Sequence, residues 1–178
     1  MKTIIFRSLL LILFIPFGSF AQIKLEKKSF IDNKIEILVP ADFKSMSAEA
    51  LEKKYPNRNH TPDVVLTDEN GEVNIVMSLI NQPLQDSLVG AYKDFQISSL
   101  KKLHPDAKWL DEGVKPINGK SVGYFKFTCS VVDDTAFNYY FFTDMDSKVM
   151  ILSFNCTEKL LSKWKETAET IVSSLKIK

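Results

Sequence analysis

The sequence predicts an α+β fold in which a mostly antiparallel β-sheet is flanked by helices on both faces, an α/β/α sandwich. Residues 137–142 and 149–152 are apolar at nearly every position. A strand with one solvated face alternates apolar and polar residues, so these strands indicate a sheet that is covered on both sides. Turn-like residues separate most of the strand-like stretches, and residues 86–103 and 157–175 carry apolar residues at helical spacing. Hairpin-linked strands covered by helices give an α+β architecture.

The composition is that of an ordinary globular protein. The 178 residues include 23 basic and 22 acidic residues, and 45% of them are hydrophobic. These values exclude a disordered chain, a collagen-like or coiled-coil rod and a disulfide-dense mini-scaffold. The near-neutral charge balance also lacks the basic excess of a nucleic-acid-binding protein, so no nucleic acid is expected as a partner.

The first 21 residues have the pattern of a secretory signal peptide. Lys2 and Arg7 make the start positive, residues 8–17 form an apolar run, and Ser19-Phe20-Ala21 is a small-x-small cleavage site. We therefore expect residues 1–21 to be removed and Gln22 to become the new N-terminus.

A membrane anchor is the competing interpretation of this segment. A spanning helix needs about 20 apolar residues, and here Pro16 and Gly18 interrupt the run. No cysteine lies near the junction, so a lipoprotein is not expected either. The mature chain, residues 22–178, would then carry 21 basic and 22 acidic residues and form a single domain. It would act in the periplasm or outside the cell, with no membrane anchor.

The first elements of the mature chain are short. Residues 22–29 alternate weakly and predict an edge strand, whereas residues 34–39 alternate clearly and predict a half-buried strand that ends at Pro40. Ser47 is suited to cap a short helix that continues through Lys54.

A hairpin and a long helix follow. Residues 63–67 and 73–80 are strand-like and flank Asn70-Gly71, a pair that favours the positive φ angles of a tight turn. Asp86 is a favourable N-cap, so we expect a helix over residues 86–103 that ends before Pro105.

The second half predicts a meander and a last helix. The expected strands are residues 107–117, 122–131, 137–143 and 149–154, with turns between them. Thr157 is a favourable cap for a final helix over residues 157–175.

In its order of motifs the chain resembles the PsbP/DcrB-like superfamily, here as an exported bacterial member. The resemblance rests on the following stretches: Val39-Pro40-Ala41-Asp42-Phe43, the hairpin at Asn70-Gly71, the long helix, Ile117-Asn118-Gly119-Lys120, Val149-Met150-Ile151-Leu152-Ser153-Phe154, and a last helix with Trp164 and Ile171-Val172-Ser173-Ser174-Leu175. It covers about residues 30–176.

This resemblance implies an antiparallel sheet flanked by helices. It implies no reaction, because such proteins mostly act by binding partners and share no catalytic residues that could be carried over. A fold alone does not determine a function.

The sequence lacks the usual constellations of catalytic and metal sites. Nucleophilic catalysis needs a nucleophile, a base and an orienting group, and the only histidines are His60 in a polar loop and His104 at an expected helix end. Structural zinc needs four closely paired ligands, which two cysteines and two distant histidines do not supply. We therefore expect no enzyme activity, no cofactor and no metal.

Cys129 and Cys156 form the one candidate disulfide pair. The meander places them on two strands that flank Phe137. Such strands are about 9.5 Å apart, whereas a disulfide requires Cα atoms within about 7 Å. The geometry therefore favours two buried free thiols.

The remaining hypotheses concern binding. Trp109, in a stretch that alternates with charged residues, and His60 are the candidate contact residues. The leading hypothesis is an exported, non-enzymatic binding or assembly protein whose partner is another protein or a small apolar ligand. A small exported hydrolase with an unusual site and an adaptor or immunity-type protein dedicated to one partner are the alternatives.

Overall fold

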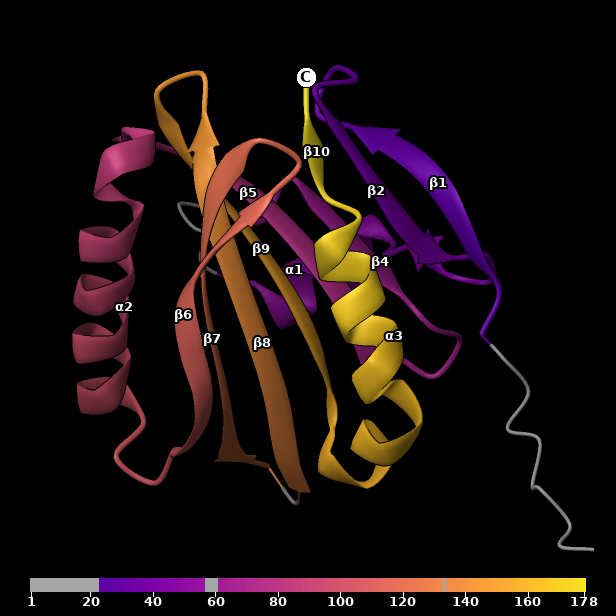
Figure 1. Ribbon diagram of the computed structural model, residues 1–178. Coiled ribbons are helices and arrows are strands. Elements are labelled where there is room, and N and C mark those ends of the chain that lie inside the picture. The colour runs from indigo at the N-terminus through magenta and orange to yellow at the C-terminus, as the bar shows by residue number, and fades with distance from the viewer. Residues whose placement is uncertain (1–22, 57–60, 133) are drawn as a thin grey trace, which may run out of the picture.

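A computed structural model describes residues 23–56, 61–132 and 134–178, so the expected signal peptide lies outside the described residues. The described elements are β1 (Leu25–Phe30), β2 (Ile35–Pro40), β3 (Lys44–Ser45), α1 (Ala48–Lys54), β4 (Val64–Thr67), β5 (Val73–Pro83), α2 (Val89–Leu103), β6 (Lys108–Ile117), β7 (Lys120–Val131), β8 (Asp134–Met145), β9 (Lys148–Thr157), α3 (Leu161–Ser173) and β10 (Lys176–Ile177). Figure 1 shows their arrangement.

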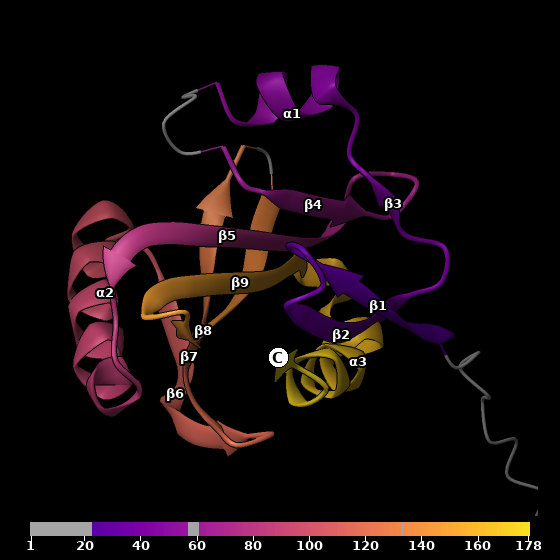
Figure 2. The same ribbon diagram turned by 90° about the horizontal axis from the view of Figure 1, so that it is seen from above.

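Antiparallel pairing organises these strands into two sheets. The larger sheet has the order β3-β4-β5-β9-β8-β7-β6, and the smaller one has the order β1-β2-β10. Helix α2 covers one face of the larger sheet, while α3 and the smaller sheet cover the other (Figure 2). The expectation of an antiparallel sheet covered on both faces is thus confirmed, and the first strand pair contributes a small sheet of its own to one of the covering layers.

The central strand β8 explains why the sequence is apolar on both faces there. Phe137, Tyr139 and Phe141 point into the core beneath α3, and Phe142 points into the core beneath α2. All four are almost completely buried. Their alternation across the sheet gives β8 two hydrophobic surfaces instead of one.

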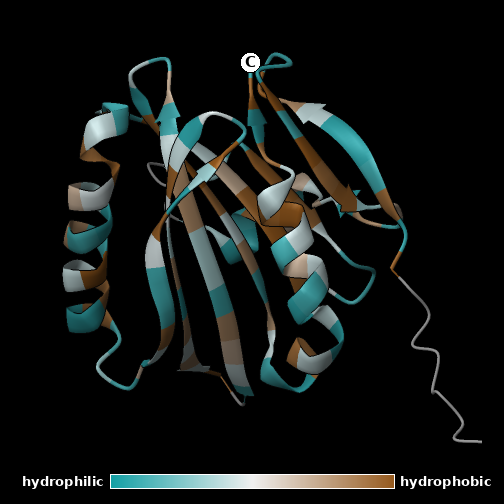
Figure 3. Cartoon of the chain, in the orientation of Figure 1, coloured by the Kyte–Doolittle hydropathy of each residue, from teal (hydrophilic) through white to brown (hydrophobic). Residues whose placement is uncertain are grey.

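The two longer strands of the smaller sheet differ in hydrophobicity. Ile35, Ile37 and Val39 of β2 are buried against α3 and the larger sheet. In Figure 3, β2 is mostly hydrophobic whereas β1 beside it is mostly hydrophilic. The charged residues of β1 are the expected protection for an edge strand.

The turns correct the expectation that Asn70-Gly71 supplies the positive φ angles of a tight hairpin turn. Only Gly71 has a positive φ in the β4–β5 connection, which the Asp68 carboxylate closes by accepting from the Val73 N–H at 3.0 Å. Both central residues are left-handed at Asn118-Gly119, with φ of 47° and 85°. The two-residue hairpin turn that an Asn-Gly pair favours therefore joins β6 and β7.

The helix starts also differ in part from the expectation. Ser47 caps α1 as predicted, since its hydroxyl accepts from the Ala50 N–H at 3.2 Å. Asp86 does not cap α2, which begins at Val89 after a 3₁₀ turn, and binds β7 instead. Thr157 precedes a 3₁₀ turn but makes no capping hydrogen bond, and its hydroxyl oxygen is buried without a partner in the described part of the chain.

Candidate functional site

The α3-side face of the larger sheet is covered unevenly. Helix α3 packs mainly against β2, β8 and β9, so the parts of β6 and β7 on this side lie beside the helix instead of beneath it (Figure 1). Side chains from these strands meet the side of α3 here. This meeting point is the candidate functional site.

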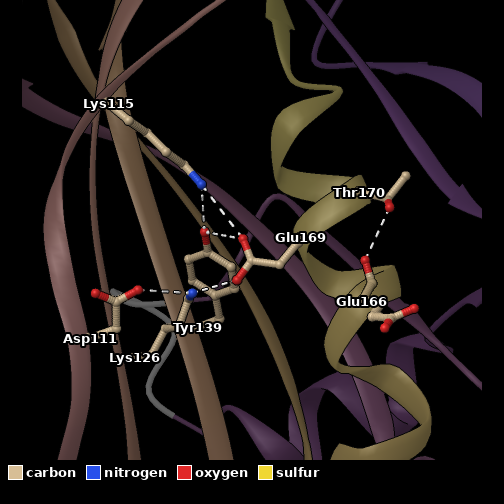
Figure 4. A network of polar contacts seen from close by, with 7 residues as sticks. All are labelled: Asp111, Lys115, Lys126, Tyr139, Glu166, Glu169 and Thr170. Atoms are coloured by element: carbon tan, nitrogen blue, oxygen red, sulfur yellow. Dashed lines mark hydrogen bonds and ion pairs between the residues drawn. The ribbon is translucent and has the colours of Figure 1, made fainter.

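The site consists of two lysines, two tyrosines and one glutamate, which we call the lysine–tyrosine cluster: Lys115, Tyr124, Lys126, Tyr139 and Glu169. Figure 4 shows both ammonium groups and the Tyr139 hydroxyl converging on the Glu169 carboxylate. Lys126 donates a hydrogen bond to Glu169 Oε1, and the Tyr139 hydroxyl donates one to Oε2 at 3.2 Å. Lys115 Nζ lies 3.6 Å from Oε2 and donates to the Tyr139 hydroxyl at 3.1 Å.

The two tyrosine rings hold the lysines in place. Lys115 Nζ lies 4.9 Å from the centre of the Tyr124 ring, and Lys126 Nζ lies 4.6 Å from that of Tyr139. The rings meet edge to face with their centres 6.0 Å apart. Ammonium groups are attracted to aromatic faces at such distances, so each lysine has an aromatic contact as well as a carboxylate.

Strand pairing explains how this arrangement forms. In the sheet register Lys126 lies opposite Tyr139, and Gly113 lies opposite Tyr124. A Cβ atom at Gly113 would come within 3.0 Å of the Tyr124 hydroxyl oxygen. The absence of a side chain at Gly113 therefore lets the Tyr124 side chain approach β6 closely.

Charge and burial raise the pKa values of three cluster residues, Tyr124, Lys126 and Tyr139. Burial by itself lowers the pKa of Lys126, but hydrogen bonds and charge from Glu169 and Asp111 outweigh it, so the net pKa is raised. The Tyr139 pKa is also raised, first by burial and then by the nearby Glu169 charge. Lys126 therefore stays charged and Tyr139 stays neutral at physiological pH, which suits hydrogen bonding and not proton transfer.

A shallow hollow adjoins the cluster on α3. It has a volume of about 430 Å³ and is lined by Leu38, Glu169, Thr170, Ser173 and Ser174. The Ser174 hydroxyl accepts from the Leu38 N–H at 2.8 Å and thereby ties α3 to β2. Glu169 belongs both to the hollow and to the cluster, so one side chain connects the two.

Of the two candidate contact residues, the structure describes Trp109 and places it apart from this cluster. Trp109 lies on the α2 face of the sheet, where its ring stacks on Phe127 with centres 5.1 Å apart and Lys101 Nζ lies 5.2 Å from its centre. His60 lies outside the described residues. His104 follows α2 and its ring lies 6.2 Å from that of Phe127. None of the described candidates joins the cluster on the α3 face.

The two cysteines lie on opposite faces of the sheet. Cys129 of β7 is buried beneath α2, and Cys156 of β9 is buried beneath α3, with β8 between the two strands. Both thiols are free in the structure. Burial raises the pKa of Cys129, and it raises that of Cys156 to about 12. Nucleophilic cysteines have lowered pKa values, so neither thiol has the properties of a reactive one.

The described residues contain no group of three or more His, Cys, Asp or Glu side chains that could hold a metal ion. Within the same ranges no helix is long and apolar enough to cross a membrane.

The sequence contained a weak signal for the cluster. Lys126 interrupts the aromatic run Tyr124-Phe125-Lys126-Phe127. In a strand that is covered on both faces, this lysine must lie on one of the covered faces and needs a polar partner there. Glu169 lies beside the apolar stripe of α3 that carries Ala168 and Val172. Neither signal reveals the cluster alone, because Lys115 and Glu169 are 54 positions apart and meet only once α3 docks.

Comparisons with known proteins were made by family, by sequence and by structure. No model of a protein family matches the chain, and no curated protein matches its sequence. Solved structures do match. The solution structure of cyanobacterial PsbP, CyanoP, from Synechocystis sp. PCC 6803 is 14% identical with a TM-score of 0.64, and the match covers 90% of this chain and 96% of CyanoP.

Two further structures have similar coverage. LpqN of Mycobacterium tuberculosis, described as involved in cell envelope biogenesis, is 14% identical with a TM-score of 0.56, over 86% of this chain and 90% of LpqN. PA94 of Pseudomonas aeruginosa, a protein of unknown function described as a putative regulator, is 12% identical with a TM-score of 0.51, over 86% and 97%.

These likenesses define the class of fold. The chain is an α+β sandwich with the PsbP/DcrB-like fold, as the order of sequence motifs predicts. At 12–14% identity they establish the fold alone, and function must be argued from the site.

Proposed function

We propose that the chain is an exported, non-enzymatic binding protein and that it contacts another protein through the lysine–tyrosine cluster and the adjoining hollow on α3. The observation that carries the proposal is the placement of two partly buried ammonium groups on the less covered part of a sheet face. The Lys115 and Lys126 side chains are only 32% and 15% exposed.

Such a cluster is a poor way to stabilise a fold. Removing an oppositely charged pair such as Lys126 and Glu169 from water costs free energy that the attraction between the two charges often fails to offset. Apolar side chains of similar size commonly stabilise a fold as well or better. A charged cluster at a surface opening is therefore more readily understood as a recognition element. Charged and aromatic groups together are also the residues that dominate protein interfaces.

The lack of enzymatic activity is part of the proposal. The described thiols have raised pKa values, and the Tyr139 hydroxyl is held in its neutral form. Ser173 lines the hollow, but no histidine is near it in the described ranges. The chemistry available at the cluster is hydrogen bonding and charge pairing.

Export supports a protein partner in the cell envelope or outside the cell. The signal-peptide pattern of residues 1–21 predicts a mature chain that begins at Gln22. The periplasm and the extracellular space are both compatible with that processing. N-terminal sequencing of the mature protein tests this part directly.

Site-specific photo-cross-linking in the producing cell tests the contact surface. A photoreactive residue at Asp111, at the exposed margin of the cluster, is expected to give one adduct of defined mass. The same residue at Lys102, on the exposed part of α2, serves as the control and should not give that adduct. Lys115→Met in the Asp111 variant should abolish it. The same adduct from both positions, or no adduct, would contradict the proposal.

A further inference from the structure

We propose that the lysine–tyrosine cluster is a carboxylate-recognition site that Glu169 fills from within the chain, and that an acidic peptide segment of the partner takes the place of Glu169. This inference rests on the proposed function and names the chemistry of the partner. In this arrangement α3 supplies an internal mimic of the ligand.

The donors of the site are built into the sheet. Lys115 and Lys126 come from β6 and β7, and Tyr139 from β8 is fully buried. The lysines are further fixed by their contacts with the tyrosine rings. Tyrosine contacts that do not depend on Glu169 pre-organise these groups, and a pre-organised site binds its ligand with a smaller entropic cost.

The carboxylate is more exposed than either ammonium group. The Glu169 side chain is 39% exposed, compared with 32% for Lys115 and 15% for Lys126. It is attached to the outer part of a helix by a side chain with several rotatable bonds. Glu169 can thus swing away by side-chain rotation, whereas the fully buried Tyr139 stays in the sheet.

Charge determines which ligand fits. Glu169 and Asp111 together balance the two lysines. When Glu169 swings out, two ammonium groups face the single carboxylate of Asp111, and a net positive site remains. An aspartate or glutamate side chain restores the balance and can accept the same hydrogen bonds from Lys126 and Tyr139.

The hollow on α3 explains why the carboxylate would belong to a peptide. It is shallow, includes Glu169 in its lining and continues past Thr170 and Ser173 toward Leu38 of β2. A segment lying along this surface could present its acidic side chain to the cluster. The hollow is open along its length, which suits an extended segment better than an enclosed small molecule.

Direct binding of a defined probe tests the inference. Hexaglutamate is titrated by calorimetry into the mature chain, residues 22–178, and into its Glu169→Ala variant at low ionic strength. We expect Glu169→Ala to bind at least about tenfold tighter, the change that one charge-assisted hydrogen bond supports. Adding Lys115→Met to this variant should remove the gain.

Matched controls separate recognition from a purely structural role. Glu166→Ala, which removes a carboxylate one turn away on α3, should leave hexaglutamate binding unchanged. Inorganic phosphate should bind Glu169→Ala more weakly than hexaglutamate does. If Glu169→Ala does not fold, as judged by circular dichroism, Glu169→Gln removes the charge while keeping the shape and is expected to show the same direction.

Two results would overturn the inference: no gain in affinity on removing the Glu169 charge, or a gain that survives Lys115→Met. Phosphate binding as tight as hexaglutamate binding, or tighter, would mean that the site recognises a free anion and not an acidic peptide. If the hexaglutamate test fails while the cross-link from position 111 still forms, only this inference is wrong and the proposed function stands. Absence of the cross-link would contradict the proposed function itself.

Discussion

Gly123 controls how closely α2 approaches the larger sheet. A Cβ atom at this position would lie 2.4 Å from the Phe142 ring and 3.0 Å from Val89 of α2. We expect Gly123→Ala to destabilise the protein by about 1–3 kcal/mol, because the core beneath α2 cannot yield that space without moving side chains. Urea denaturation measures the change.

Gly90 provides the matched control for this substitution. A Cβ atom there has its nearest neighbour at 3.7 Å, an ordinary contact with Val114, and alanine is the better helix former. Gly90→Ala should therefore leave stability unchanged or raise it by up to about 1 kcal/mol. Equal destabilisation by both substitutions would contradict the crowding explanation.

The cysteines give a second prediction at this scale. Because burial raises both pKa values, to about 12 for Cys156, the thiols should remain protonated and react very slowly with iodoacetamide at pH 8 in the folded protein. In guanidinium chloride without reductant both should be alkylated, as read by intact mass. A protein that gains no label even when unfolded, and is two hydrogens lighter, would carry the disulfide that the sequence disfavours.

At the scale of elements, one carboxylate attaches the start of α2 to the start of β7. Asp86 accepts from the Ser121 N–H at 2.8 Å and from the Ser121 hydroxyl at 2.6 Å. These two hydrogen bonds lower the pKa of Asp86 below its ordinary value of 3.8. A carboxyl group whose pKa is lower in the folded state stabilises the fold above its unfolded pKa and loses that effect as the pH falls through the folded value.

The pH dependence of an Asp86 variant follows from this sign. Asp86→Asn should lower the urea midpoint at pH 7, and its difference from the unmodified protein should shrink as the pH falls below about 3.8. Asp42→Asn, at an exposed position after β2, is the control and should show neither effect. A difference that is constant from pH 7 to pH 2.5 would assign the effect to shape instead of ionisation.

Several elements were predictable because their signals are local. Ser47 caps α1 and the apolar residues of β8 require two covered faces, as the sequence predicts. The roles of Asp86 and Thr157 were not predictable in this way, because both residues favour helix caps in isolation. Asp86 instead meets Ser121, 35 positions away, and tertiary contact overrides the local preference.

At the scale of the whole molecule, the candidate site is the part that the sequence leaves undetermined. Lys115, Lys126, Tyr139 and Glu169 come from three strands and a helix. Each has an ordinary surface or core role when considered alone. Only the pairing of β6 with β7 and the docking of α3 make them neighbours, so their shared chemistry appears after the fold and not before it.

The two cores on opposite faces of one sheet should unfold together. The core beneath α3 and the core beneath α2 both draw side chains from β7, β8 and β9, so loss of packing in one core weakens the strands that form the other. Small domains with such shared elements usually unfold in one cooperative transition. Trp164 belongs to the first core, and Trp109 packs against the second.

The two tryptophans therefore report on the two cores separately. In Trp164→Phe the remaining Trp109 monitors the core beneath α2, and in Trp109→Phe the remaining Trp164 monitors the core beneath α3. Within each variant, the urea midpoint of tryptophan fluorescence should equal that of far-ultraviolet circular dichroism, because the strands that give the dichroism signal are common to both cores. A fluorescence midpoint displaced from the dichroism midpoint of the same variant would mean that one layer leaves the sheet first, and the layer containing α3 would then be the one able to expose the lysine–tyrosine cluster.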